Sequence, residues 1–345
     1  MRILILGSGA VGTLLGGLLS YSGSEVFFSG NRENLKVLEK VGLRIQLPGR
    51  WLKLSGLKPG AMDREAEALN DQGAGSVPGS PADALSNGAD FLFITLKRRH
   101  LKTLKPACLA EQPLSAGGKI IFFNCDPADK DKLTPAGAES YLALTLLNAV
   151  MLQPGDVELA SSRSVLIYEK NRELKRLLSS LKVLGIELYE ADHIEPYANS
   201  FFLWQLLFLP AAMCQTTYEN FLSYPEGREI AARILEEGLN TYLKLKRSLK
   251  RLPYMDPQDL LSRIEKGGKG FTAARFRPDR AYNSLLQSIL KEKMLENREL
   301  NGRLIKMAGQ AGVDPLWNWR LNQKLSRVLR VGFYKDPVEL YQAIK

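Results

Sequence analysis

The sequence predicts an α/β N-terminal half, in which helices cover a parallel sheet, followed by a C-terminal half made only of helices. Short apolar runs alternate with amphipathic stretches from residue 2 to residue 42. After residue 192, apolar residues recur at helical spacing and strand-like runs nearly disappear. Because 345 residues are enough for two separate cores, we expect one domain over 1–190 and another over 191–345.

The first half should open with a strand, a helix, a second strand and a second helix. These are RILIL (2–6), AVGTLLGGLLSY (10–21), EVFFS (25–29) and ENLKVLEKVG (33–42). The later runs Ala89 to Lys97 and Gly118 to Asn124 are apolar on consecutive residues. This pattern is typical of strands buried on both faces, so both runs should extend the same sheet.

The remaining segments of this half are less regular. Residues 47–60 (LPGRWLKLSGLKPG) are typical of a hairpin or of edge strands, and residues 71–83 (DQGAGSVPGSPAD) of a flexible surface loop. Strand-like runs within 140–169 and a helix from Arg172 to Leu184 should complete the α/β half.

The second half should form a helical bundle. Its apolar periodicity covers FFLWQLLFLPAAM (201–213), the stretch 228–251 and the stretch 282–312. We expect 201–213 to be core, with a dimer seam as the alternative. The basic run from Lys244 to Arg251 is expected to be a solvated helix face.

Composition excludes several classes of function. A formal net charge of +10 suits nucleic acid, an acidic membrane surface or an anionic small ligand. The basic run lacks interleaved aromatic residues, which argues against nucleic acid. No apolar run reaches the roughly 18 residues of a membrane span, and glycines interrupt the apolar N-terminus early. The chain is therefore expected to be cytoplasmic. Its cysteines and histidines share no metal-binding spacing; they are Cys108, Cys125, Cys214, His100 and His193.

A G-x-G-x-x-G motif stands between the first predicted strand and the first predicted helix. In that context the glycines allow a tight turn and close approach of the backbone to a pyrophosphate, while the helix N-terminus offers free N–H groups. A Rossmann-type dinucleotide site is predicted. Its cofactor-binding residues would be Gly7, Ser8, Gly9, Ala10, Val11 and Gly12.

The residues at the end of the second strand indicate which dinucleotide the site binds. NAD-binding sites usually place an acidic residue there for the ribose 2′-OH, whereas this chain has Asn31 and Arg32. A guanidinium matches a 2′-phosphate in geometry and charge, so NADPH is the expected cofactor. Glu33 is the alternative acidic residue if the strand ends later.

Two polar residues end the predicted central strands. Ligands of open α/β sheets bind beyond the carboxyl ends of the strands. Lys97 is therefore predicted to meet a cofactor phosphate, and Asn124 the nicotinamide ribose or the substrate. Ordinary polarity at the start of a loop is the alternative for each residue.

These features together resemble the ketopantoate reductase (2-dehydropantoate 2-reductase) family, whose members reduce an α-keto acid with NADPH in pantothenate biosynthesis. The resemblance rests on ILGSGAVG (5–12), the strand before Lys97, IIFFN ending at Asn124, and LNAVMLQPGDVELA (147–160). In the helical half, Ser284, Glu296 and Asn301-Gly302 fall at the family's spacing.

The resemblance implies catalytic roles for three residues. Ser284 would contact the substrate carboxylate or hydroxyl, Glu296 would lie at the cofactor and substrate, and Asn124 would bridge both ligands. It also implies a small 2-keto acid as substrate, bound between the two domains. The helical domain is expected to serve substrate binding or dimerisation, with a homodimer as the expected assembly in the latter case. Neither nucleic acid nor a membrane is an expected partner.

The chain departs from the family at the proton donor. Aligned on Pro210, the family's lysine position is occupied by Phe201 and two asparagine positions by Gln205 and Leu209; aligned on Trp204 instead, Leu206 takes the lysine position. Glu219 replaces a further asparagine. A positioned acid contributes roughly 10²- to 10⁴-fold in rate, or about 3–5 kcal/mol, and phenylalanine supplies none of this. The sequence therefore predicts either a reductase with an altered substrate, using Tyr197, Tyr218 or His193 as donor, or a non-catalytic NADP(H)-binding sensor or scaffold.

Overall fold

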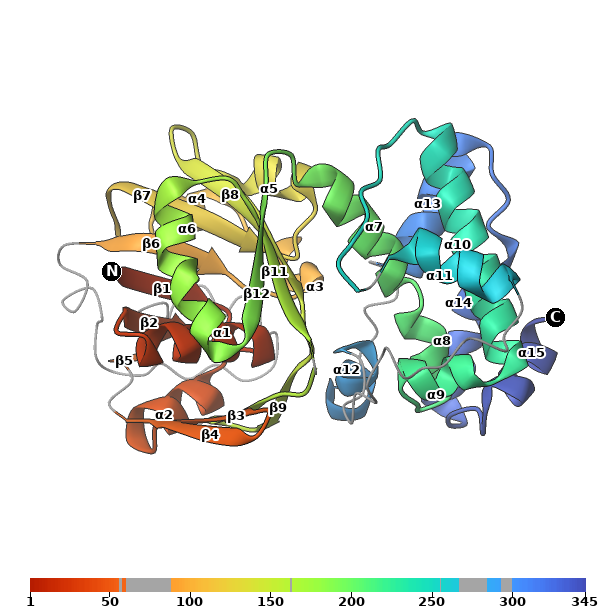
Figure 1. The fold of residues 1–345 in the computed structure, drawn as a ribbon, viewed down its shortest axis with the longest axis horizontal. Coiled ribbons are helices and arrows are strands. Elements are labelled where there is room, and N and C mark those ends of the chain that lie inside the picture. Colours follow the sequence, from red (N-terminus) through yellow and green to blue (C-terminus); the bar gives the residue numbers. More distant parts are fainter. Residues whose placement is uncertain (56–57, 60–87, 162, 255, 267–283, 293–299) are drawn as a thin grey trace. The chain divides into compact units, whose positions relative to one another are not determined.

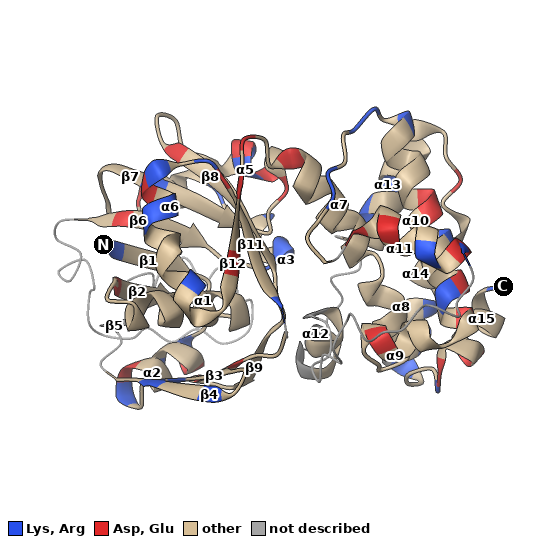
Figure 2. Cartoon of the chain, viewed as in Figure 1, with Lys and Arg blue, Asp and Glu red and all other residues tan. Residues whose placement is uncertain are grey.

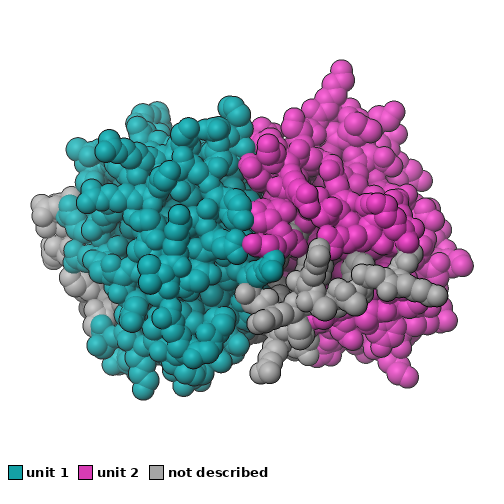
Figure 3. All heavy atoms as spheres, viewed as in Figure 1, with its two compact units in different colours: residues 1–194 teal, residues 195–345 magenta. Residues whose placement is uncertain are grey.

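The computed structural model describes residues 1–55, 58–59, 88–161, 163–254, 256–266, 284–292 and 300–345. The chain divides into two compact units, residues 1–194 and residues 195–345 (Figure 3). The boundary expected at residue 190 falls inside β12 (Ile186–Ala191), the last strand of the first unit.

The first unit is built on an eight-stranded sheet with the order β12-β11-β8-β7-β6-β1-β2-β5 (Figure 1). Strand β11 runs antiparallel to β8, and the other neighbouring pairs are parallel. This confirms the predicted α/β class. Besides β12, the strands are β1 (Arg2–Leu6), β2 (Glu25–Ser29), β5 (Lys58–Pro59), β6 (Ala89–Ile94), β7 (Leu114–Phe123), β8 (Glu139–Leu146) and β11 (Ser164–Glu169).

A second sheet, which the sequence did not predict, lies on the other side of α1 (Ala10–Tyr21). Its order is β4-β3-β10-β9, from β3 (Leu43–Leu47), β4 (Arg50–Leu54), β9 (Ala149–Gln153) and β10 (Asp156–Leu159). The β3–β4 hairpin and the edge strand β5 agree with the expectation for residues 47–60, but the pairing of β3 with β10 joins distant segments.

Two adjacent glycines let α1 pack between the two sheets. A Cβ on Gly16 would lie 2.6 Å from the Phe28 ring of the first sheet. A Cβ on Gly17 would lie 2.6 Å from Ile45 of the second sheet. Larger side chains at these positions would therefore push the helix, and the loop before it, away from the sheets.

Short helices connect the strands of the first unit. They are α2 (Arg32–Lys40), α3 (Arg98–Leu101), α4 (Pro106–Ala110), α5 (Pro127–Leu133) and α6 (Arg172–Leu178), with a 3₁₀ helix at Ser179–Leu184. The prediction of a single helix over 172–184 is thus wrong for residues 179–184, which form the 3₁₀ helix. Ser179 and Ser180 donate hydroxyl hydrogen bonds to the carbonyls three residues earlier, at 2.7 and 3.0 Å, which favours the tighter turn.

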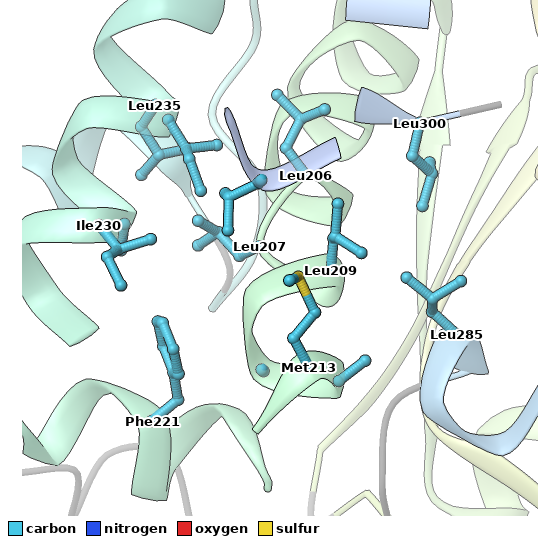
Figure 4. Packing of buried hydrophobic residues seen from close by; sticks show 14 of the residues in the cluster. Leu206, Leu207, Leu209, Met213, Phe221, Ile230, Leu235, Leu285 and Leu300 are labelled. Carbon is cyan, nitrogen blue, oxygen red and sulfur yellow. The ribbon is translucent and has the colours of Figure 1, made fainter. Parts of the chain in front are cut away.

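In the second unit, the described residues form helices and no strands, as predicted (Figure 1). Figure 4 shows part of its core, where Met213, Phe221 and Ile230 from three helices and Leu207 from the turn before α8 belong to one cluster. The helices are α7 (Glu195–Gln205), α8 (Phe208–Met213), α9 (Tyr218–Ser223), α10 (Pro225–Lys244), α11 (Pro257–Glu265), α12 (Ser284–Glu292), α13 (Asn301–Ala311), α14 (Leu316–Arg330) and α15 (Pro337–Ile344).

The basic run after α10 corrects another expectation. Its lysine and arginine side chains are exposed as predicted, but the helix ends at Lys244 and the rest of the run is a turn followed by chain without regular secondary structure. The reason lies in α7: Asn199 Nδ2 donates to Ser248 O at 3.0 Å, and Ser200 Oγ accepts from Lys250 N at 3.1 Å. These contacts hold the backbone away from helical geometry.

Both signs of charge are distributed over each unit (Figure 2). In the described part of the chain, no group of three or more His, Cys, Asp or Glu side chains is placed to hold a metal ion. A search of the same residues finds no helix with the length and apolar character needed to cross a membrane.

Candidate dinucleotide site

The glycine loop between β1 and α1 has a backbone that larger residues cannot adopt. Gly7 has φ +116°, and its N–H donates to Ser29 O at 2.8 Å. A Cβ on Gly7 would lie 2.9 Å from the Thr95 backbone carbon, and one on Gly12 would collide with Gly7 O. Both positions therefore require glycine, and the loop, β2 and the chain after β6 lie in direct contact.

The space beside the loop is suited to an anion. No described heavy atom lies within 4 Å of a Cβ built on Gly9, the N-cap residue of α1. The first turn of α1 has no acidic residue and no capping side chain, so its N–H groups and positive dipole end are available. Ser8 Oγ is buried without a hydrogen-bond partner among the described residues. These features fit a pyrophosphate held against Ser8, Gly9, Ala10 and Val11.

Thr95 is a supporting residue that the sequence did not reveal. It follows β6 and donates from Oγ1 to Gly7 O at 2.7 Å. The one feature of the sequence that could have indicated this role is its position at the carboxyl end of the strand that pairs with β1. The hydroxyl fixes the carbonyl at the start of the glycine loop.

The turn after β2 lies against the glycine loop. Gly30 has φ +146°, and a Cβ there would lie 2.6 Å from Ser8 N. Asn31 caps α2, accepting a hydrogen bond from Asn34 N at 3.0 Å. The first two residues of that helix, Arg32 and Glu33, have exposed side chains. Strand β2 ends at Ser29 and is followed by Gly30 and Asn31. The end of this strand therefore has no acidic residue of the kind that usually binds the ribose 2′-OH of NAD.

Lys97 lies beyond the strand that was expected to contain it. Strand β6 ends at Ile94, and Lys97 is instead the N-cap residue of α3, with a half-buried side chain. Thr95 N still donates to Leu6 O of β1 at 2.9 Å, and Lys97 follows two residues further along the chain. Lys97 is still at the carboxyl edge of the sheet. Its contact with a cofactor phosphate stays a prediction.

Asn124 is held in one orientation. It follows β7 with φ +54°, its Nδ2 donates to Thr145 Oγ1 at 2.6 Å, and its Oδ1 accepts from Thr145 N at 2.8 Å. The buried Thr145 on β8 therefore fixes the amide. The next residue, Cys125, is buried, and burial raises the pKa of its thiol to about 12, so it is no nucleophile at neutral pH.

The predicted substrate-side residues belong to the second unit. Ser284 is the first residue of α12, and Glu296 lies outside the described residues. Asn301 begins α13 fully buried; its Nδ2 donates to Leu206 O at 3.3 Å and to Asn318 Oδ1 at 2.8 Å. Asn301 therefore links helices within the core.

Helices α7 and α8 carry no amine at the position of the family lysine. Phe201 is 6% exposed, and Leu209 is fully buried. Tyr218 packs between Trp204 and Phe208, its hydroxyl donates to Trp204 O at 3.1 Å, and burial raises its pKa well above the ordinary value. Because that proton is held by a carbonyl, Tyr218 is a poor acid.

The remaining candidate residues of the sequence analysis differ in how exposed their side chains are. His193 is exposed, whereas Tyr197 and Gln205 are half-buried on α7. Glu219, which replaces an asparagine of the family pattern, has a buried Oε2 without a partner among the described residues. Burial raises the pKa of its carboxyl group.

The parallel sheet, its covering helices and the glycine loop between β1 and α1 define a Rossmann-like fold, here followed by a helical unit. Residues 3–170 match the family model described as "Ketopantoate reductase PanE/ApbA". Over these residues, just under half of the chain, the sequence is similar to the ketopantoate reductase family.

Curated relatives align over nearly the whole chain. The 2-dehydropantoate 2-reductase of Pyrococcus horikoshii is 23% identical over 333 residues, which cover 93% of this chain and 95% of the relative. The enzyme of the same name from Pyrococcus abyssi is 21% identical over 328 residues, covering 92% and 94%.

Solved structures share the two-unit fold. A PanE/ApbA family ketopantoate reductase from Ralstonia eutropha superposes with a TM-score of 0.71 at 19% identity, covering 95% of this chain and 98% of that one. D-mandelate dehydrogenase with NADH and anilino(oxo)acetate gives 0.72 at 17% identity, covering 96% and 98%.

Proposed function

We propose that the chain is an NADPH-dependent reductase that converts a small 2-keto acid into the 2-hydroxy acid. The family-model match over residues 3–170 and the names of the curated relatives support an oxidoreductase resembling 2-dehydropantoate 2-reductase. The structural neighbour D-mandelate dehydrogenase, solved with NADH, supports a nicotinamide dinucleotide and widens the substrate choice. At 23% identity or less, 2-dehydropantoate is the first substrate to test rather than the only one.

The observation that carries the proposal is the open space at Gly9 beside the buried, unpartnered Ser8 Oγ. A pyrophosphate there would receive N–H groups from α1 and the serine hydroxyl. Arg32 and Asn31, in the turn that contacts Ser8 through Gly30, favour a 2′-phosphate at the adenosine end. Lys97 would neutralise a further cofactor phosphate.

NADPH would supply the hydride that reduces the ketone, and a proton from another source completes the hydroxyl. Asn124, fixed by Thr145, would orient the nicotinamide ribose or the substrate. Ser284 and Glu296 would contact the substrate. Since Phe201 cannot donate a proton, we assign this role to Tyr197, which lies four residues earlier on α7 and so on the same helix face.

The test begins with fluorescence titration of NADPH and NADH, followed by oxidation of NADPH in the presence of 2-dehydropantoate, phenylglyoxylate and other 2-keto acids. We expect tighter binding of NADPH and turnover of at least one keto acid. Tyr197→Phe should lower kcat without changing the Kd of NADPH. If neither nicotinamide dinucleotide binds, the proposal is refuted.

A second candidate function is a non-catalytic NADP(H)-binding sensor or scaffold. The observation that favours it is the burial of Phe201 at the position of the family lysine, in a stretch without lysine from 183 to 243. It predicts NADPH binding with no turnover of any 2-keto acid.

A further inference from the structure

Asn34 connects four parts of the first unit through one buried side chain. It lies on α2, 4% exposed. Its Nδ2 donates to Ser8 O in the glycine loop at 2.7 Å and to Thr13 Oγ1 on α1 at 3.2 Å. Its Oδ1 accepts from Gly155 N at 2.8 Å, in the turn between β9 and β10 of the second sheet.

Only an amide satisfies these partners. Ser8 O is an acceptor and needs a donor, whereas Gly155 N–H is a donor and needs an acceptor. Aspartate would place an oxygen against Ser8 O, and an aliphatic residue would leave Gly155 N–H unpaired and Ser8 O with Thr13 Oγ1 as its remaining donor. Asn34 therefore fits this position by its hydrogen-bonding pattern and not by size alone.

The contacts fix the spacing between two proposed phosphate sites. Ser8 belongs to the loop proposed for the pyrophosphate, and Asn31 and Arg32 form the turn proposed for the 2′-phosphate. Asn34 belongs to the same helix turn as Arg32, and its backbone N–H is capped by Asn31. Its side chain thus ties the helix that carries the 2′-phosphate residues directly to the pyrophosphate loop.

We propose that Asn34 is a positioning residue for cofactor selectivity, holding the α2 turn at the distance from Ser8 that lets one NADPH molecule engage both phosphate sites. The inference rests on the proposed NADPH site and adds a residue that touches neither phosphate. A ligand that occupies both sites depends on their spacing, whereas a ligand that occupies one does not.

The test compares Asn34→Ala with wild type in titrations of NADPH, NADH and adenosine 2′-monophosphate. We expect the Kd of NADPH to rise about tenfold and that of NADH about twofold. A tenfold rise corresponds to the loss of one or two buried hydrogen bonds. The Kd of adenosine 2′-monophosphate should stay within about twofold, because this fragment does not reach the pyrophosphate loop. The selectivity ratio for NADPH should thus fall about fivefold.

Asn171→Ala is the matched control. Asn171 caps α6 and donates from Nδ2 to Tyr141 OH at 2.9 Å, so it also ties a helix to a strand of the same unit, but it makes no contact with the glycine loop. We expect this variant to lower Tm without changing the selectivity ratio. If Asn34→Ala raises both dinucleotide Kd values equally, or neither, Asn34 is only structural and the inference is wrong.

Thr13→Val keeps the test valid if Asn34→Ala fails to fold. Thr13 Oγ1 accepts from Asn34 and donates to Ser8 O at 3.1 Å, and valine has nearly the same shape. It should lower the selectivity ratio in the same direction, by about twofold; an unchanged ratio would overturn the inference. If wild type binds neither dinucleotide, the proposed function itself fails, which the wild-type titration shows before any variant is made.

Discussion

The glycine loop of the first unit and helices α7 and α8 of the second unit differ sharply in polarity. Around the loop, Thr95 fixes a carbonyl, and Ser8 and the N-terminus of α1 leave hydrogen-bonding groups for a ligand. Along α7 and α8, Phe201 and Leu209 stand where the family pattern has polar residues. In the proposed reductase, binding of the dinucleotide and transfer of the proton would therefore depend on separate parts of the chain, so that one could change while the other is kept.

The largest effect is expected from Gly12→Ala. The new Cβ would collide with Gly7 O and Thr95 Oγ1, so we expect about 3 kcal/mol lower free energy of unfolding and a loss of NADPH affinity above about 100-fold. Gly9→Ala is the control, because its Cβ meets no described atom within 4 Å. It should cost about 1 kcal/mol or less but weaken NADPH at least about tenfold by filling the pyrophosphate space. Urea unfolding and fluorescence titration measure both; unchanged binding in Gly9→Ala would place the cofactor elsewhere.

Phe201→Lys tests the other side of the comparison. Restoring an amine at this position should raise kcat for the accepted keto acid at least about tenfold, since a positioned acid contributes roughly 10²- to 10⁴-fold. The rate should then decline at high pH as the lysine loses its proton. Burying the ammonium in a site that is 6% exposed in wild type should also lower Tm. Phe201→Met controls for altered packing; equal rates in both variants would show that this position does not supply the proton.

Arg32→Ala separates the two cofactors. Loss of a charge-assisted contact to the 2′-phosphate costs about 1.5–3 kcal/mol, so the Kd of NADPH should rise roughly 10- to 100-fold while that of NADH stays nearly constant. Glu33→Ala is the companion variant, because Glu33 is the alternative ribose ligand. Weaker NADH binding in Glu33→Ala, with no change of NADPH in Arg32→Ala, would make this an NAD-binding site.

Local patterns were sufficient to predict β1, α1, β2 and the glycine loop, because each is a contiguous run whose periodicity determines its structure. The second sheet was missed because β3 pairs with β10 more than 100 residues away, and no periodicity reports such pairing. Asn34, Thr95 and Thr145 were missed for a related reason. Each acts through a hydrogen bond to a distant backbone or side-chain group, so only the fold reveals its role.

The smallest effect concerns Glu237, which shows that the helical unit retains polar groups for its own packing. The carboxylate on α10 accepts from Trp317 N at 2.6 Å and Asn318 N at 3.0 Å, and Asn318 in turn accepts from Asn301. Burial outweighs these hydrogen bonds and raises the pKa of Glu237 above its ordinary value. A carboxyl group with a raised folded-state pKa contributes stability that is fully present below its unfolded pKa and is lost as the pH rises through the folded pKa.

We therefore expect the free energy of unfolding of wild type, relative to Glu237→Gln, to fall as the pH rises from the acidic range through that raised pKa and then to level off. Urea unfolding of both proteins across this range, with Glu236→Gln on the same helix as the control, measures the difference. The Kd of NADPH should be the same in all three proteins, because Glu237 lies in the second unit and its hydrogen bonds join helices of that unit. A pH-dependent change of NADPH affinity in Glu237→Gln would instead mean that the polar core of the helical unit influences the dinucleotide site, and the separation of the two regions would not hold.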